Sequence, residues 1–263
     1  MEEKMKKRMF SGMLVAAVAV AGQFVQPQAG MPAVGMQQAE AFSLGGALGS
    51  VLNAVFQLDM GSMQSHQQSL MKNLAWAAQL EAVSAERWGH VANVDTARAA
   101  AASNSAKAFL QNGDYSLPKF KAFHSSFASN IALSDGDKTQ MTTSLDNLMT
   151  DKDKLTTEQN TQYVTEAKKA RRMAATYNAL AAKDAAYIIH GAVKAFASGN
   201  LGDQLSAVQS MADVAKEAQS FLKLQRDVSK ERANLTQKAE KAMNVKDPSD
   251  KDAKAYAKSL GME

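Results

Sequence analysis

Histidine offers the broadest chemistry of any side chain in this sequence, because a neutral imidazole can bind metal or haem and exchange a proton near neutral pH. The chain contains four histidines: His66, His90, His124 and His190. No two stand four positions apart, the spacing that sets two metal ligands on one helix face, and no glutamate precedes any of them by three positions. We therefore expect structural or surface roles for all four and assign neither a metal nor a cofactor. His190, which follows two isoleucines, is the one to test for haem or metal.

Two carboxylates flank a glycine at Asp135-Gly136-Asp137, a pattern that also occurs in calcium-binding loops. The bidentate glutamate that completes such a loop is absent at the required distance. Small polar side chains near a helix start instead bond to the first backbone amides. We therefore predict that this segment, together with Ser134, begins a helix.

Motifs for covalent or phosphate chemistry are missing from the sequence. The chain has no cysteine, which excludes disulfides, thiol nucleophiles and cysteine-bound metals. It has neither a G-x-S-x-G nucleophile turn nor a phosphate-binding loop. Helix seams rich in alanine also leave few of the concave, water-excluded pockets in which catalytic acids and bases have perturbed pKa values. The sequence therefore favours a protein that is not an enzyme.

The densest positive charge lies at Lys168, Lys169, Arg171 and Arg172. The simplest interpretation is a solvated helix face; the functional alternative is contact with an acidic partner, such as phospholipid headgroups or an anionic envelope polymer. Residues 151–263 carry nineteen basic and fifteen acidic side chains, and the formal charge of the whole chain is only +4. So mild an excess does not predict nucleic acid as a partner, particularly for an exported protein.

These basic residues lie in the stretch around which the sequence is organised, residues 156–244. Thr156-Thr157-Glu158-Gln159 predicts a helix start, in which a threonine hydroxyl caps free backbone amides and Gln159 reaches back to the capping residue. From Tyr163 to Phe196, apolar or small residues recur every three or four positions, and no proline interrupts them. A helix from Thr157 to Ser198 would be on the order of 60 Å long.

A second helix is predicted to return along the first. Glycines after Ser198 end the first helix, and the stripe of apolar and small residues continues from Leu205 to Ala242, with a weaker, polar interval near Gln225 and Arg226. Short connections favour antiparallel neighbours. Alanine buries little area at roughly 25 cal/mol per Å², so this hairpin needs further helices or another subunit.

Shorter helices are predicted on both sides of the hairpin, and Phe120, Phe123 and Phe127 lie at helical spacing that predicts core positions. We therefore predict an all-α fold: an elongated helical bundle built around a long, coiled-coil-like antiparallel hairpin. A further long helix is expected at 64–91, and short helices are expected at 96–112, 117–133, 135–149 and 253–260. The predicted parts of the chain are an N-terminal helical segment (42–155), the hairpin (156–244), and a charged linker with a short helix (245–263).

The first residues have the pattern of a secretory signal peptide. Four basic side chains between Lys4 and Arg8 precede a short apolar run from Met9 to Ala21. Small residues allow cleavage after Ala21 or after Ala41, and residues 22–41 read as a flexible linker if they are retained. The alternative is an uncleaved amino-terminal anchor. Export would place the protein in the periplasm or outside the cell.

Residues 42–56 are apolar and contain glycines, unlike the rest of the chain. One interpretation is a first helix or strap that docks on the bundle. The other is a membrane-surface or self-association segment, because Gly45 and Gly49 form a G-x-x-x-G pattern, although the segment is too short to span a membrane. The residues that would make those contacts are Phe42, Leu44, Gly45, Gly49, Leu52 and Phe56.

These observations predict a non-enzymatic exported protein, a structural or protein–protein interaction component of the cell envelope that works through a protein partner or self-association. The plan of a signal peptide and a long helical bundle recurs among secretion-system and pilus accessory proteins, an analogy of architecture alone. One alternative is a helical-bundle binding protein for haem, metal or a lipid-like ligand, lined by histidines and by the nine methionines after residue 41. Another is a peripheral membrane protein anchored by residues 42–56.

Overall fold

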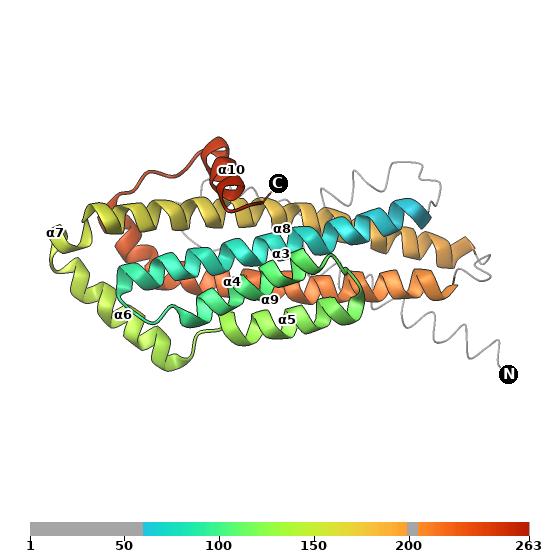
Figure 1. Cartoon of the computed structure of the whole chain (residues 1–263), viewed down its shortest axis with the longest axis horizontal. Helices are drawn as coiled ribbons and strands as arrows, with labels where there is room; N and C mark the ends of the chain where they lie inside the picture. Colours follow the sequence, from blue (N-terminus) through green and yellow to red (C-terminus); the bar gives the residue numbers. More distant parts are fainter. Residues whose placement is uncertain (1–59, 199–204, 263) are drawn as a thin grey trace, which may run out of the picture. The chain divides into compact units, whose positions relative to one another are not determined.

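The computed structural model describes residues 60–198 and 205–262, and its helices keep the labels of Figure 1. In these ranges every regular element is helical, which confirms the predicted all-α bundle. The helices are α3 (Met60–Ala92), α4 (Ala97–Asn112), α5 (Leu117–Ile131), α6 (Asp135–Met149), α7 (Lys152–Leu155), α8 (Glu158–Ser198), α9 (Leu205–Met243) and α10 (Asp250–Ser259). The predicted signal peptide, the linker at 22–41, the segment 42–56 and the turn between α8 and α9 lie outside the described residues.

The described residues form two compact units, and the three longest helices contribute to both. The small unit contains residues 60–69, 182–198 and 205–216, and the large unit contains residues 70–181 and 217–262. Neither unit is a continuous stretch of sequence. Each is therefore stabilised by contacts between helices that are distant along the chain.

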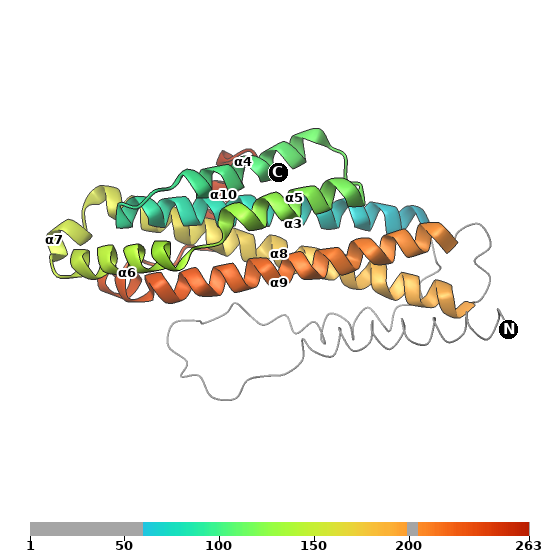
Figure 2. The same cartoon turned by 90° about the horizontal axis from the view of Figure 1, so that it is seen from below.

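In the large unit, α3, α8 and α9 lie side by side (Figures 1 and 2). Arg87 of α3 pairs with Glu166 of α8 at 2.6 Å, and Trp76 of α3 lies against Tyr177 of α8 with ring centroids 5.0 Å apart. Residues that come later in α3 thus meet residues that come earlier in α8, so these helices are antiparallel. In the same unit α8 and α9 also run in opposite directions, as the sequence predicts.

A cluster of phenylalanines joins α4 and α5 to α9. Phe120, Phe123 and Phe127 of α5 are at most 4% exposed, which confirms the predicted core positions. All three lie against Phe221 of α9 with ring centroids 5.2–5.6 Å apart, and Phe109 of α4 stacks on Phe123 at 4.8 Å. Aromatic pairs at these separations add to the stabilisation from burial alone. The cluster therefore fixes the α4–α5 pair on α9.

A second apolar cluster lies where α6 and α7 meet the long helices. It contains the largest buried side chains of this part, Trp88, Met141, Leu145, Leu155 and Met243, together with Val164 and Ala239. The polar joint predicted after Met149 thus contains a short helix, α7, which buries Leu155 in this cluster.

The polar interval predicted in the α9 seam lies inside the protein. Gln225 is only 1% exposed, and its side-chain amide donates a hydrogen bond to the carbonyl of Leu74 at 3.1 Å, while its Oε1 atom is buried without a hydrogen-bond partner. The bond to the backbone of another helix therefore compensates only part of the cost of burying this side chain.

The start of α8 also differs from the predicted capping box. The hydroxyl of Thr157 accepts a hydrogen bond from the amide of Asn160 at 3.2 Å, so the threonine cap is confirmed. Gln159 does not reach back to the cap; its side-chain amide donates to the hydroxyl of Tyr163 at 2.9 Å. The contact with an aromatic partner one turn later replaces the reciprocal bond.

Two other helices begin with complete capping boxes. At α6, Ser134 accepts from the amide of Asp137 while the Asp137 carboxylate accepts from the amide of Ser134, which confirms the predicted helix start. At α10, Ser249 and Asp252 form the same arrangement. The helix α10 therefore begins at Asp250, three residues before the predicted start. The capping box satisfies backbone amides that come before the first apolar residue, so the helix can start ahead of the apolar pattern.

In the small unit, α3 packs closely on α8 at Gly191. A Cβ atom on Gly191 would lie 3.0 Å from the sulfur of Met63, so the glycine makes room for the buried methionine. Ile188 and Val208, both fully buried, extend this core along α8 and α9. The small unit therefore has an apolar core of its own.

Candidate interaction site

The basic residues singled out in the sequence lie beside the C-terminal segment of the same chain. The ammonium of Lys168 is 2.7 Å from the carboxylate of Asp247 and donates to the carbonyl of Val245 at 2.6 Å. The guanidinium of Arg172 donates to the carboxylate of Asp250 at 2.7 Å. Both contacts join α8 to the residues that lead into α10. We call α10, its preceding segment 244–249 and the surface beneath them the C-terminal junction.

The other two residues of the basic cluster differ in their surroundings. Arg171 pairs with Glu240 of α9 through two contacts of 2.9 and 3.1 Å, so it joins α8 to α9. Lys169 lies close enough to Asp252 to act on its pKa, which is lowered first by hydrogen bonds from Ser249 and further by the lysine charge. Three of the four predicted residues therefore face acidic residues of the C-terminal segment.

The surface beneath α10 combines small and large apolar residues. Ala77, Ala170 and Ala174 are fully buried there, and Ala257 of α10 packs into the same cluster at 1% exposure. Small side chains let two helix backbones approach closely, and larger ones then pack at the edges. The larger residues of this cluster are Leu80, Val83, Tyr177 and Met262, with Trp76, Met173, Tyr256 and Leu260 partly buried beside them.

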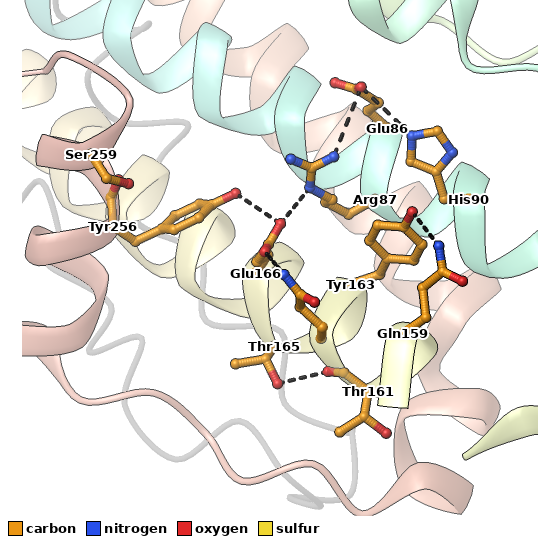
Figure 3. A network of polar contacts seen from close by, with 11 residues as sticks. Glu86, Arg87, His90, Gln159, Thr161, Tyr163, Thr165, Glu166, Tyr256 and Ser259 are labelled. Carbon is orange, nitrogen blue, oxygen red and sulfur yellow. Dashed lines mark hydrogen bonds and ion pairs between the residues drawn. The ribbon is translucent and has the colours of Figure 1, made fainter. Parts of the chain in front are cut away.

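Figure 3 shows a polar network in which the carboxylate of Glu166 holds α10 and α3 to α8. It lies 2.6 Å from the guanidinium of Arg87 and accepts a longer bond of 3.5 Å from the hydroxyl of Tyr256. Burial, and secondly the charge of Glu166, raise the pKa of Tyr256 above its ordinary value. Burial acts to lower the pKa of Arg87, but its bond to Tyr256 and the charge of Glu166 outweigh that effect and raise it.

The network continues toward the start of α8. Glu86 lies 3.9 Å from Arg87 and 3.7 Å from His90, and the ring of His90 stacks on Tyr163 with centroids 5.1 Å apart. The hydroxyl of Tyr163 in turn accepts from Gln159 (Figure 3). The charged side chains of this face thus have partners within the chain.

A second charged cluster lies inside the large unit. Glu81 of α3 is 4% exposed, and burial raises its pKa to about 7 although a bond from Ser229 and the charges of Arg171 and Arg232 act in the opposite direction. Burial likewise lowers the pKa of Arg232 to about 10. The Arg232 guanidinium donates to the carbonyl of Ile131 at 2.7 Å. We call these residues the buried charge cluster.

The histidines occupy separate places. In the small unit, His66 lies 2.7 Å from Asp184, whose second oxygen accepts from the hydroxyl of Ser69 at 2.7 Å. In the large unit, His124 lies 2.7 Å from Glu217. His190, the residue chosen for a haem or metal test, is partly buried on α8. Among residues 60–198 and 205–262, no three His, Asp or Glu side chains are grouped as metal ligands.

A hollow lies on the surface where α6 ends and α7 begins. It is open to solvent and is lined by a nearly continuous run of residues from Asn147 to Lys154. A hydrogen bond from Lys154 lowers the pKa of Asp151, which caps α7. A hollow built by one turn of chain does not enclose a ligand from several sides, as small-molecule sites do.

Sequence reasoning missed the acidic half of the C-terminal junction. Asp247 and Asp250 belong to the segment read as a charged linker, and the density of acidic residues around Pro248 was the signal available. The six apolar and glycine positions predicted for membrane or self-association contact, Phe42, Leu44, Gly45, Gly49, Leu52 and Phe56, lie outside the described residues. Within the part of the chain that the structure describes, no helix combines the length and the hydropathy needed to cross a membrane.

The arrangement thus provides a helix-binding face, formed by alanines and larger apolar residues and edged by basic side chains, that is occupied by a helix of the same chain whose first turn is acidic. Comparison with known proteins adds no relative, because no family model, no curated protein and no solved structure matches this chain.

Proposed function

We propose that this protein is a non-enzymatic helical component of the cell envelope that acts through protein–protein contact. One observation carries the proposal: a face of α3 and α8 holds an amphipathic helix by close alanine packing and charge pairing. Helix-in-groove docking is a general mode of recognition between proteins. In the proposed function, the protein holds a partner by the same close packing and charge pairing. The location in the envelope rests on the amino-terminal sequence pattern.

The distribution of charged groups supports contact over catalysis. A catalytic acid or base needs access to its substrate, and the group with the most perturbed carboxyl pKa, Glu81, is enclosed between helices. The guanidinium groups of Arg87, Arg171 and Arg172 are engaged by carboxylates of neighbouring helices. These groups therefore serve to join helices.

The large unit also exposes an apolar side chain near the C-terminal junction. Leu180 of α8 is 45% exposed, one turn beyond Tyr177, which packs in the apolar cluster beneath α10. A single exposed leucine is ordinary on a protein surface. Its position on α8 makes it a suitable site from which to probe for a partner without disturbing the core.

The proposal is tested by photo-crosslinking in intact cells. A photoreactive residue replaces Leu180, and a matched control replaces Lys223 on α9, which is 71% exposed. We expect a discrete crosslinked product, either a homo-oligomer or a complex with one partner, from position 180 and less from position 223. Only monomer at both positions, at native abundance, would refute the proposed function.

A further inference from the structure

We propose that the apolar segment 42–56 packs on the side of α8 that faces away from α3 in the small unit. Four apolar residues at steps of three or four positions form this side of the helix: Ala182, Ala186, Ile189 and Val193. We call them the outer stripe. The inference concerns a different face from the C-terminal junction and does not depend on the proposed partner contact.

Contacts within the small unit show which side of α8 faces α3. The carboxylate of Asp184 lies 2.7 Å from His66, and Gly191 lies against the side chain of Met63. Successive residues of an α-helix point about 100° apart, so Ala186 points about 200° away from Asp184. The outer stripe therefore lies on the opposite side of α8 from α3.

The apolar core of the small unit occupies a neighbouring side of α8. Ile188 is fully buried and shares this core with Val208 of α9. Ala186 points about 200° away from Ile188 as well, so contact with α9 does not account for its burial. Ala186 is nevertheless only 3% exposed, and the other three residues of the outer stripe are partly buried. Because α3 and α9 are the other described helices of this unit, a further part of the chain covers the stripe.

The segment that precedes α3 is placed to supply this cover. Helix α3 begins at Met60 in the small unit, and the apolar segment ends four positions earlier, at Phe56. If only residues 42–52 contact the stripe, residues 53–59 still span up to about 24 Å when extended, which exceeds the roughly 10 Å diameter of a helix. The connection is therefore long enough to pass around α8.

The chemistry of the two surfaces also matches. Segment 42–56 contains no charged side chain, and neither does the outer stripe. Gly45 and Gly49 stand four positions apart in the segment. Ala182 and Ala186 have the same spacing in the stripe, and small residues at this spacing let two backbones approach closely. Packing together removes apolar area of both surfaces from water, which favours the contact.

Thiol labelling tests the cover in the full-length protein, because the chain has no cysteine of its own. Ala186→Cys places a thiol in the outer stripe, and Lys183→Cys, the matched control, places one at an exposed position of the same helix. A covered thiol reacts with maleimide only when its cover opens, so we expect labelling at position 186 to be slower by roughly tenfold or more.

Charge in the segment should remove the protection. Leu48→Asp with Leu52→Asp, combined with Ala186→Cys, should accelerate labelling at position 186 to nearly the rate of the Lys183→Cys control. Circular dichroism and thermal melting check that each variant is folded. Slow labelling that persists at position 186 in the folded aspartate variant would overturn the proposal, because other residues would then cover the stripe.

A cross-link decides which copy supplies the segment. Isotopically labelled and unlabelled chains, both with Ile189→Cys and Leu48→Cys, are mixed and oxidised, and the linked peptides are analysed by mass spectrometry. We expect each linked peptide to contain one isotope only, because the two positions belong to the same chain. Peptides that join the two isotopes would overturn the proposal in favour of self-association. Sedimentation of the wild type with phosphatidylglycerol vesicles, lost in the Leu48→Asp and Leu52→Asp variant, would overturn it in favour of membrane contact.

Discussion

The two charged clusters of the large unit differ in burial, and this difference assigns them different tasks. In the buried charge cluster, Glu81 is 4% exposed and the Arg232 guanidinium bonds to a backbone carbonyl of α5. At the C-terminal junction, Asp250 is 85% exposed. Burying a charge destabilises the folded state unless all of its ion-pair and hydrogen-bond partners are present. Exposed ion pairs, in contrast, change the free energy of unfolding little. The buried cluster therefore fixes how α3, α5 and α9 fit together, and the junction holds α10 reversibly.

The largest expected effect comes from removing one side of the buried cluster. Arg232→Met leaves Glu81 with less compensation and the Ile131 carbonyl without its donor, so we expect a loss of about 3 kcal/mol in the free energy of unfolding at pH 8. Urea denaturation measures it. Arg172→Met, at the exposed junction, is the matched control and should leave global stability nearly unchanged. Equal losses in both variants would remove the distinction between the clusters.

The pH dependence of stability tests the buried cluster from the other partner. The pKa of Glu81 in the folded protein is about 7, above its ordinary value of 4.5, so the folded state binds this proton more tightly. The contribution of Glu81 is therefore most favourable below pH 4.5 and falls as the pH rises to 7, by about 3 kcal/mol in total.

Glu81→Gln removes this titration and keeps a side chain that can bond to Ser229. We expect the wild type to lose stability between pH 5 and pH 8 in urea denaturation, and the variant to lose much less over the same range. The same decrease in both proteins would show that Glu81 is not its source.

Lowering the pH should weaken the C-terminal junction, whereas it increases the contribution of Glu81 to stability. A hydrogen bond from Arg172 lowers the pKa of Asp250, and bonds from Ser249 lower that of Asp252, both from an ordinary value of 3.8. Groups with lowered folded pKa values contribute stability above their ordinary pKa, and that contribution is lost as the pH falls through the folded value. We expect α10 amides to keep their hydrogen-exchange protection from pH 8 to pH 5 and to lose it below about pH 4. Loss near pH 6 would point to another group.

The smallest expected effect is that of a single junction charge. Asp250→Asn removes the charge that faces Arg172, and the exposed pair contributes little to the whole fold. We expect the melting temperature to stay within measurement error while exchange of α10 amides becomes faster. Lys223→Gln, which breaks an exposed pair within α9, should leave α10 unchanged. A lowered melting temperature in Asp250→Asn would mean that the junction supports the whole unit.

The helices and much of the core could be predicted from the sequence because their signals are local. Phe120, Phe123 and Phe127 stand at helical spacing, and Ser134 with Asp137 forms a cap within four residues. Local patterns of this kind need no knowledge of other helices. They were less informative at Gln225, whose buried side-chain amide donates a hydrogen bond to a carbonyl 151 positions away in the chain.

Only half of the candidate site could be predicted from the sequence. The density of charge singled out Lys168 and Arg172, but their partners lie 79 and 78 positions later in the chain. Nothing in the spacing of residues within α8 shows which distant segment its exposed face meets. Nothing in the sequence around Glu81 indicated a buried charge, because its burial results from three helices that come together only in the folded protein.

Native-state hydrogen exchange of the wild-type protein tests the central claim most directly, because it measures opening of the C-terminal junction and of the buried cluster in one sample. At pH 7 we expect amides of α10, residues 250–259, to open far more readily than amides near Glu81 and Arg232, and to open more readily still in 1 M salt. If α10 amides exchange only with global unfolding, at the rate of the α3 centre and independently of salt, then α10 is a permanent part of the core and the account of a reversible helix-binding face is wrong.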